Sequence, residues 1–319
     1  MTMTSDGESP TQRREPRTIT LPPLNEATIH RAQEGLAAAR NQHMRDAAKG
    51  ALVNAEQLLD GGSDRKMPSA QRRLLLRIFI HLLFRVTIKY PERIPTGPVM
   101  VASNHLNHMD PFLILSTTHA TPFYYILGDT RTMFNKPWKR AFVRLTGGVV
   151  PVDRMWKEEQ SVVEAARAGN TEVATLASEI TRDVPDGGSI ETLRLMDRIV
   201  QTIFKNGDSI LIFPEGGLGT QEGQLRLPLK RGTVLYAMRS GVPIVPMAIS
   251  GTRDLFLRKH LIVRYGAALH FPQIDRPRPK QVQAALEELQ DAIQTLLPHD
   301  YQEPKGIHLF QRMLNQMFW

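Results

Sequence analysis

A histidine and an aspartate stand five positions apart in residues 104–110, which read NHLNHMD. The segment follows an apolar run at 98–103, so we expect it to form the loop after a buried strand. A neutral imidazole that a carboxylate holds in place can remove a proton from a hydroxyl near neutral pH. His105 and Asp110 therefore indicate an enzyme that activates an alcohol.

Other interpretations of these residues are open at this point. Asp110 stands before Pro111, which is typical of a helix N-cap, and a loop histidine can have an incidental partner. A metal site of His105, His108 and Asp110 would need further ligands, and no other His-rich cluster stands in the chain. The two histidines are also three positions apart, whereas the metallo-hydrolase pattern places them two apart. We therefore expect no metal.

Three further blocks follow in order, each at one end of an apolar run. Arg154 ends the segment GGVVPVDR, Glu215 and Gly216 lie in the segment FPEG, and residues 242–246 read VPIVP. Each block alone is also common in ordinary turns, where Pro and Gly often stand at strand ends. Loops at strand ends are where an open α/β fold builds its site. The order of the blocks therefore favours one common site.

Short apolar runs alternate with helical patterns from residue 98 onward. The candidate strands are residues 98–103, 123–127, 148–152, 209–213, 243–249 and 261–265. The candidate helices include residues 110–118, 136–145, 190–205, 233–240 and 280–297. Strands separated by helices predict an α/β fold, with a central, mostly parallel β-sheet flanked by helices and an N-terminal helical, membrane-associated module.

The chain divides into four expected parts. A disordered tail at 1–26 precedes N-terminal helices at 27–90. The α/β domain spans 91–299 and carries an insertion at 155–189. Residues 300–319 form a C-terminal amphipathic helix, whose apolar side either packs on the core or contacts a membrane.

Residues 71–90 combine a basic stripe with an apolar side, as a helix in a membrane interface does. Arg73, Arg77 and Arg85 belong to the stripe, and each such charge adds on the order of 1 kcal/mol at an anionic surface. The alternative is a helix packed on the domain with solvated arginines. We expect the interfacial helix.

The composition limits the possible partners. The 319 residues carry a formal charge of +8, which favours anionic partners, and the chain has no cysteine for thiol catalysis. It has no apolar stretch long enough for a membrane span and no secretory signal at its N-terminus. Because the basic residues cluster beside apolar runs and no nucleic-acid motif is present, we expect lipid partners and no nucleic acid.

Taken together, these blocks resemble the phospholipid and glycerol acyltransferase superfamily, which includes lysophosphatidic acid acyltransferases. The NHxxxxD block matches residues 104–110, the Asp-Arg strand end matches Asp153 and Arg154, and the FPEG block matches residues 213–216. The later proline strand matches residues 242–246. The resemblance covers roughly residues 75–270, in the order of the family.

The resemblance implies a catalytic pair. His105 would act as the general base on a glycerol hydroxyl, and Asp110 would orient its imidazole. The acyl donor would be acyl-CoA or acyl carrier protein, used as a substrate, with no further cofactor.

The resemblance also implies the acceptor site. Arg154 would bind the acceptor phosphate, and Asn104, Glu215 and Gly216 would shape the site, with Glu215 able to accept a hydrogen bond from an acceptor hydroxyl.

One departure concerns the cation that the family often has after the third block. The family continues with Thr-Arg-Ser, whereas this chain continues with Gly217, Leu218 and Gly219. Phosphate recognition would then rest on Arg154 together with Lys230 or Arg231.

The expected function is transfer of a fatty acyl group to the hydroxyl of a lysophospholipid, most of all 1-acyl-glycerol 3-phosphate. The protein would lie at the cytoplasmic face as a peripheral or monotopic membrane protein. One alternative is another lysophospholipid or a glycolipid as acceptor. Another is a non-catalytic protein that binds lipid surfaces.

Overall fold

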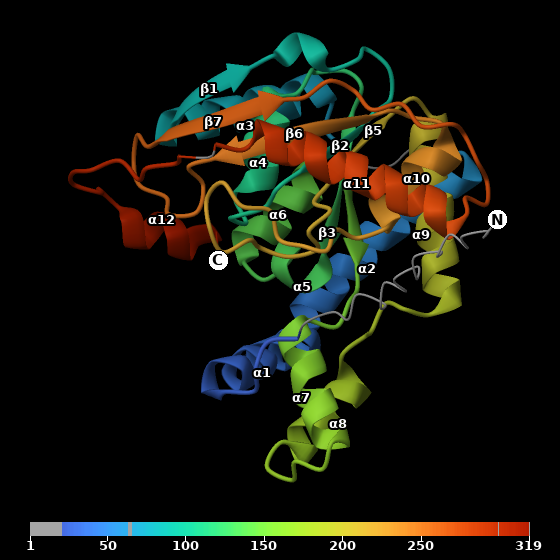
Figure 1. The fold of residues 1–319 in the computed structure, drawn as a ribbon, viewed down its shortest axis with the longest axis vertical. Helices are drawn as coiled ribbons and strands as arrows, with labels where there is room; N and C mark the ends of the chain where they lie inside the picture. Colours follow the sequence, from blue (N-terminus) through green and yellow to red (C-terminus); the bar gives the residue numbers. More distant parts are fainter. Residues whose placement is uncertain (1–20, 63–65, 299, 319) are drawn as a thin grey trace, which may run out of the picture.

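A seven-stranded β-sheet forms the centre of the protein in the computed structural model, which describes residues 21–62, 66–298 and 300–318 (Figure 1). The strand order is β1-β7-β6-β2-β5-β3-β4. Neighbouring strands are parallel except for β6 and β7, so β1 and β7 run opposite to the other five. The strands are β1 (Arg85–Lys89), β2 (Met100–Ser103), β3 (Tyr124–Asp129), β4 (Val149–Val152), β5 (Ser209–Ile212), β6 (Ile244–Ser250) and β7 (His260–Tyr265).

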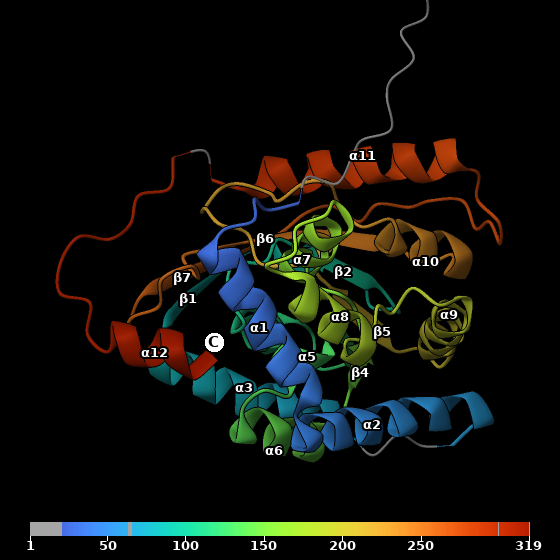
Figure 2. The ribbon, with the colours of Figure 1, turned by 90° about the horizontal axis from the view of Figure 1, so that it is seen from below.

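Helices cover both faces of this sheet (Figure 2). Alternate residues of β2 show the two faces: Val99 and Val101 join one apolar cluster, and Met100 and Ala102 join the other. The first face packs on α3 (Ser69–Leu83), α4 (Asp110–Thr117), α6 (Pro137–Thr146) and α12 (Gln311–Phe318). The second packs on α9 (Ile190–Lys205), α10 (Gly232–Ser240) and α11 (Pro279–Leu296). The mostly parallel α/β fold expected from the sequence is confirmed.

Strand β1 corrects the expectation of a helix up to residue 90. Helix α3 ends at Leu83, and the next residues pair with β7, with Val86 opposite Leu261 and Ile88 opposite Val263. The β-branched residues in Arg85–Lys89 favour a strand, although Arg85 stands at the spacing of the basic stripe. The sheet therefore begins before residue 91, and Arg85 does not belong to the amphipathic helix.

The N-terminal helices are two, α1 (Glu26–Arg40) and α2 (Gln42–Gln57), followed by the short η1 (Leu58–Asp60). Asn41 separates them because its side chain accepts a hydrogen bond from the backbone N–H of Met44 and caps α2. Another short helix, η2 (Pro91–Arg93), follows β1. Most of the tail predicted to be disordered, residues 1–20, lies outside the described residues.

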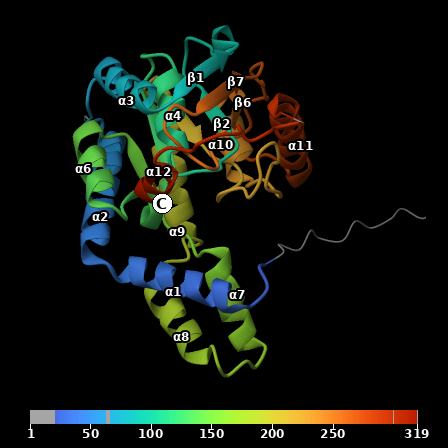
Figure 3. The same ribbon diagram turned by 90° about the vertical axis from the view of Figure 1, so that its left-hand side faces the viewer.

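The segment predicted to be an insertion forms α7 (Lys157–Arg167) and α8 (Ala174–Asp183), and both project from the sheet together with α1 (Figures 1 and 3). Their contacts make a third apolar cluster, in which Leu36 of α1 meets Val162 of α7 and Ile180 of α8. We call α1, α7 and α8 the helical arm.

The C-terminal helix packs on the domain with only part of its predicted apolar side. Leu314 and Phe318 are buried, whereas Phe310 and Met313 are more than half exposed. The buried Lys139 donates a hydrogen bond to the Phe318 carbonyl, at 2.7 Å. Packing on the core therefore accounts for one part of the stripe.

Candidate active site

Strands β2, β5, β3 and β4 are neighbours, and the loops that follow them meet at one edge of the sheet. The loop after β2 carries His105, and Asp110 opens α4 just beyond it. The loop after β5 carries Glu215. Asp129 ends β3, and Arg154 follows β4. The sheet thus brings together blocks that lie between positions 104 and 216 of the sequence.

His105 and Asp110 form a hydrogen-bonded pair. The Nδ1 atom of His105 lies 2.9 Å from Oδ2 of Asp110, whose side chain is fully buried. The same oxygen accepts hydrogen bonds from the backbone N–H groups of Leu106 (2.7 Å) and Asn107 (2.8 Å). The carboxylate therefore fixes the loop that carries the histidine, rather than serving as the cap of α4.

The surroundings of the imidazole leave its second nitrogen available. The ring of His105 stacks on Phe213, with 4.0 Å between ring centroids. Nδ1 faces Asp110, and within the described residues no hydrogen bond to Nε2 is found. Burial, with His105 and nearby cations, holds the pKa of neighbouring His108 well below its usual 6.5. His108 is therefore neutral and adds no charge beside His105.

Asn104 follows β2 directly, and its side chain contacts the neighbouring strand β6. Its side chain is fully buried and makes two hydrogen bonds to Ile249 of β6, as donor at 3.1 Å and as acceptor at 2.8 Å. The side-chain amide of Asn104 thus ties the end of β2 to β6.

Glu215 bridges two loops of the site. Its two carboxylate oxygens accept hydrogen bonds from two loops, Oε1 from the His105 N–H and Oε2 from the Arg226 N–H, both at 2.7 Å. It is almost fully buried, and burial raises its pKa from 4.5 to about 7 against the opposing effect of these N–H groups. Glu215 therefore connects the loop that carries His105 to the loop that carries Arg226.

Gly216 adopts a left-handed backbone conformation, with φ of +63°, that favours glycine. A Cβ atom there would lie 2.7 Å from Cε of Lys230. Gly216 therefore allows the Lys230 side chain to lie against the backbone of the FPEG block. Arg231 is exposed, and among the described residues no hydrogen bond or ion pair joins its side chain to the site.

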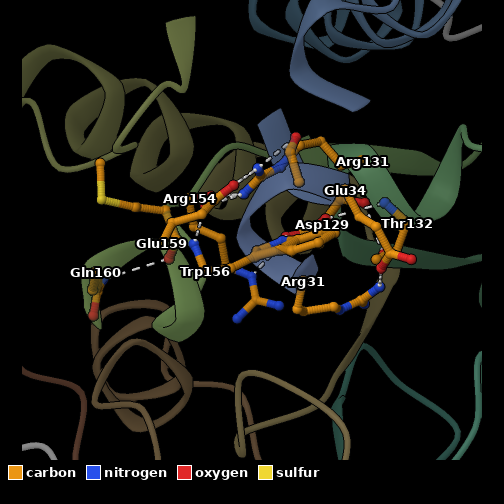
Figure 4. Close-up of polar contacts among 11 residues, drawn as sticks. Arg31, Glu34, Asp129, Arg131, Thr132, Arg154, Trp156, Glu159 and Gln160 are labelled. Atoms are coloured by element: carbon orange, nitrogen blue, oxygen red, sulfur yellow. Dashed lines mark hydrogen bonds and ion pairs between the residues drawn. The ribbon is translucent and has the colours of Figure 1, made fainter. Parts of the chain in front are cut away.

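Arg154 is held in place by its neighbours (Figure 4). Its Nε donates to Oδ2 of Asp129 at 2.7 Å, and Nη1 donates to the Gly216 carbonyl. The indole of Trp156 donates to the same Asp129 oxygen at 3.0 Å. The Arg154 side chain remains about one-third exposed, at 35%. One side of the guanidinium is thus fixed while another part faces solvent.

A buried ion pair connects this region to the helical arm (Figure 4). Arg131 of α5 (Thr130–Met133) pairs with the fully buried Glu159 of α7 and donates to the Gly35 carbonyl of α1. It also donates to the Arg154 carbonyl at 2.7 Å. Its guanidinium carbon lies 4.2 Å from the ring centroid of Trp156. This network was not predictable from the sequence, because 28 positions separate Arg131 and Glu159.

The expected basic stripe of α3 is divided among three environments. Arg73 donates to the Thr118 carbonyl at 2.5 Å, Arg77 is exposed, and Arg85 lies on β1. Four apolar residues on the same helix near Arg77 are exposed. They are Leu74 (60%), Leu75 (44%), Ile78 (60%) and Leu82 (70%). In the described part of the chain, none of the helices is sufficiently long and apolar to cross a bilayer.

No group of three or more His, Cys, Asp and Glu side chains suited to a metal ion occurs among residues 21–62, 66–298 and 300–318. His105, His108 and Asp110 thus do not form such a group. The site is one of acid–base and cationic side chains.

Comparisons with known proteins identify the family of the chain. Residues 85–250 match the family model described as Acyltransferase. The chain is 26% identical over 185 residues to the chloroplastic 1-acyl-sn-glycerol-3-phosphate acyltransferase BAT2 of Brassica napus, covering 56% of this chain and 41% of that protein. It is also 26% identical over 195 residues to the 1-acyl-sn-glycerol-3-phosphate acyltransferase of Borreliella burgdorferi, covering 60% of this chain and 62% of the relative.

The chain thus spans about half the length of these curated relatives. Among solved structures it is similar to the 1-acyl-sn-glycerophosphate acyltransferase PlsC of Thermotoga maritima, with 18% identity and a TM-score of 0.39 over 82% of this chain and 87% of that one. The family model covers more than half of the chain and contains His105, Asp110, Arg154 and Glu215. The chain belongs to the Acyltransferase family.

Proposed function

We propose that this protein transfers a fatty acyl group from an acyl thioester to the free hydroxyl of 1-acyl-glycerol 3-phosphate. The observation that carries the proposal is the His105 imidazole, with Nδ1 held 2.9 Å from Asp110 and Nε2 available to a substrate. The names of the relatives support the acceptor, because each is called a 1-acyl-sn-glycerol-3-phosphate acyltransferase. The donor is acyl-CoA or acyl carrier protein.

The proposed reaction is a direct transfer. Nε2 of His105 removes the proton of the acceptor hydroxyl while the oxygen attacks the thioester carbonyl, and Asp110 stabilises the imidazolium. The tetrahedral intermediate collapses by breaking the carbon–sulfur bond. The thiolate takes the proton from His105, which gives the ester and a free thiol. The step requires no cofactor besides the thioester, and the chain has no cysteine to form a thioester intermediate.

Replacement of the base tests the proposal. His105→Ala should lower kcat by about 10²–10⁴, the usual contribution of a positioned general base, with little change in KM. Asp110→Asn should also lower kcat strongly, because the amide lacks the charge that stabilises the imidazolium and can favour the wrong tautomer of His105. The measurement is thiol release with 1-acyl-glycerol 3-phosphate as acceptor.

The exposed His270, replaced by alanine, is the matched control. Full turnover by His105→Ala would refute the catalytic role. Vesicle binding by the wild type without turnover on any lysophospholipid or glycolipid would favour the non-catalytic alternative.

We further propose that the protein binds the cytoplasmic face of a membrane peripherally or monotopically through α3. The four exposed apolar side chains near Arg77 support this, because contiguous exposed apolar surface marks a contact site and anionic lipid attracts nearby cations. Because Arg73 is hydrogen-bonded to the Thr118 carbonyl and Arg85 lies on β1, replacing the exposed apolar residues is the sharper test.

Ile78→Asp with Leu82→Asp should lower binding to phosphatidylglycerol-containing vesicles by about tenfold or more, since each replacement removes roughly 1.5–3 kcal/mol of apolar burial. Vesicle sedimentation measures the change. Ile190→Asp with Leu193→Asp is the matched control, because these two exposed apolar residues lie on α9, at the other face of the sheet. Equal binding by both double variants would count against α3 as the contact.

A further inference from the structure

Four cationic side chains converge beside the FPEG block from separate parts of the chain. Arg154 follows β4, Lys157 opens α7, and Arg226 and Lys230 belong to the loop after β5. We call these four residues the cationic cluster. A Cβ atom at Gly217 would lie 2.5 Å from Nη1 of Arg226 and 4.0 Å from Nη1 of Arg154. The two guanidinium groups therefore approach the same point on the backbone.

The electrostatic effects within the cationic cluster agree with this proximity. The pKa of Lys230 is lowered, first by partial burial and second by the charges of Arg154 and Arg226. Partial burial, then Arg226 and Lys230, lower the pKa of Lys157, while the neighbouring Glu158 opposes the change. Each cation therefore lies in the positive potential of the others.

Little negative charge compensates the cationic cluster. Asp129 pairs with Nε of Arg154, and Arg226 donates to the neutral Leu218 carbonyl at 3.0 Å. Across the described ranges, no ion pair joins Lys157, Arg226 or Lys230 to a carboxylate. Glu158 lies near Lys157 and Glu215 near Arg226, but in the described residues neither carboxylate forms an ion pair with these cations. The converging positive charges therefore still raise the local potential and attract an anion. The site therefore suits a phosphate monoester, which accepts several charge-assisted hydrogen bonds.

The cationic cluster lies directly beside the base. One carboxylate, that of Glu215, accepts from the N–H of His105 with one oxygen and from the N–H of Arg226 with the other. The Gly219 N–H also donates to the His105 carbonyl at 2.6 Å. A small acceptor that carries both a hydroxyl and a phosphate can therefore reach His105 and the cationic cluster together.

Gly217 connects this arrangement to the departure from the family pattern. The family often has threonine and arginine where this chain has Gly217 and Leu218. A side chain at Gly217 would collide with the guanidinium of Arg226, at 2.5 Å from its Cβ. The loss of the threonine side chain therefore makes room for an arginine from a later position in the loop.

We propose that Arg226, with Lys157 and Lys230, completes the binding site for the acceptor phosphate and replaces the cation missing after Gly216. This inference rests on the proposed acyltransferase function. It also gives the predicted insertion a role, because Lys157 is the first residue of α7. Arg226 binds the phosphate and takes no part in the proton transfer.

Kinetics with both substrates tests the proposal. Arg226→Ala should raise KM for 1-acyl-glycerol 3-phosphate by about 10- to 100-fold, the usual effect of losing a hydrogen bond to a charged group. KM for acyl-CoA and kcat should change little. Lys157→Ala should have the same direction and a smaller effect. The control is Lys280→Ala, which removes one exposed positive charge on α11.

A rescue variant separates binding from misfolding. Gly217→Thr with Leu218→Arg restores the family pattern, and in the Arg226→Ala background it should recover most of the lost affinity. The same two replacements in the wild type should weaken binding, because the threonine displaces Arg226. Unchanged KM values in Arg226→Ala would overturn the proposal. A rise in KM for acyl-CoA alone would also overturn it, because the cationic cluster would then bind the phosphates of the donor.

Direct binding keeps the inference independent of turnover. Isothermal titration with a short-chain 1-acyl-glycerol 3-phosphate should show binding that Arg226→Ala weakens, and the matching 1-acyl-glycerol without phosphate should bind wild type and variant alike. Such binding without turnover on any acceptor would support the cationic cluster and refute the proposed function. Normal turnover with binding indifferent to Arg226→Ala would refute the cationic cluster alone.

Discussion

The two sides of the site differ in how their charges are compensated. On the side of the base, the buried Asp110 receives three hydrogen bonds through one oxygen, from His105, Leu106 and Asn107. On the side of the cationic cluster, Arg154 has a carboxylate partner in Asp129, while Lys157 and Lys230 lie near like charges. On the first side the positions of His105 and its loop are fixed by the protein itself, and on the second side positive charges lie close together.

The difference indicates two separate functions. A base that is already oriented spends no binding energy on its own ordering, so its effect falls on kcat. Uncompensated cations gain most from an anion that binds in both the ground and the transition state, so their effect falls on KM. Variants of the two sides should therefore separate in kinetics.

Replacing Glu215 should affect both sides of the site most strongly, because one of its oxygens binds the loop of His105 and the other binds the loop of Arg226. Glu215→Gln keeps one acceptor but points an N–H group at the other backbone donor, which leaves a buried N–H unsatisfied at about 1–3 kcal/mol. We expect kcat to fall and KM for 1-acyl-glycerol 3-phosphate to rise, by about tenfold or more in kcat/KM. A change in one parameter alone would show that Glu215 serves a single side.

The same variant should alter how stability depends on pH. Because burial raises the pKa of Glu215 from 4.5 to about 7, the folded protein holds this proton more tightly than the unfolded chain. The free energy of unfolding should therefore fall as the pH rises from about 5 to about 8, by up to about 3 kcal/mol from this group. Urea unfolding across that range measures the slope, which Glu215→Gln should reduce and the exposed Glu288→Gln should keep.

Asp129 offers a finer test, because it contacts the cationic side only. Its Oδ2 accepts from Arg154 and from Trp156, so Asp129→Asn should loosen the guanidinium without reaching His105. We expect KM for 1-acyl-glycerol 3-phosphate to rise by up to about fivefold with kcat nearly constant, since partly exposed ion pairs contribute about 1 kcal/mol or less. Steady-state kinetics with varied acceptor measures it.

Asp197→Asn is the matched control for Asp129→Asn, because Asp197 of α9 also pairs with an arginine, at 2.9 Å. A fall in kcat without a change in KM would join Arg154 to the chemistry and remove the distinction between the two sides.

Sequence patterns predicted the repeated units of the fold but not its edges. Six strands and the helices between them follow from local apolar runs, whereas β1 is stabilised by pairing with β7, far along the chain. The spacing of basic and apolar residues in β1 alone predicted a continuation of helix α3. The segment is short enough for tertiary pairing to override local periodicity.

The site was predictable where residue type determines chemistry. His105, Asp110, Arg154 and Glu215 do meet at one sheet edge, as their positions after strands indicated. The partners of Asn104 and Glu215 were not predictable, because which backbone N–H and carbonyl groups need a side-chain partner depends on loop geometry.

Arg226 and Lys157 were missed for a related reason. Each reaches the site through an irregular loop or a projecting helix, where spacing in the sequence carries no distance information. Lys230 or Arg231 was expected to act with Arg154, and of these two the side chain of Lys230 lies over Gly216 while Arg231 is exposed.

The helical arm has a consequence for how the protein is made. Helix α1 buries Leu36 and Ala39 against α7 and α8, which follow more than a hundred positions later. Since a ribosome releases the chain from its N-terminus, α1 emerges long before the helices that cover it. The apolar side of α1 therefore stays uncovered in the nascent chain while β2, β3 and β4 are still being synthesised. The pairing of Arg131 with Glu159, which joins the arm to the sheet, becomes possible only once α7 has been synthesised.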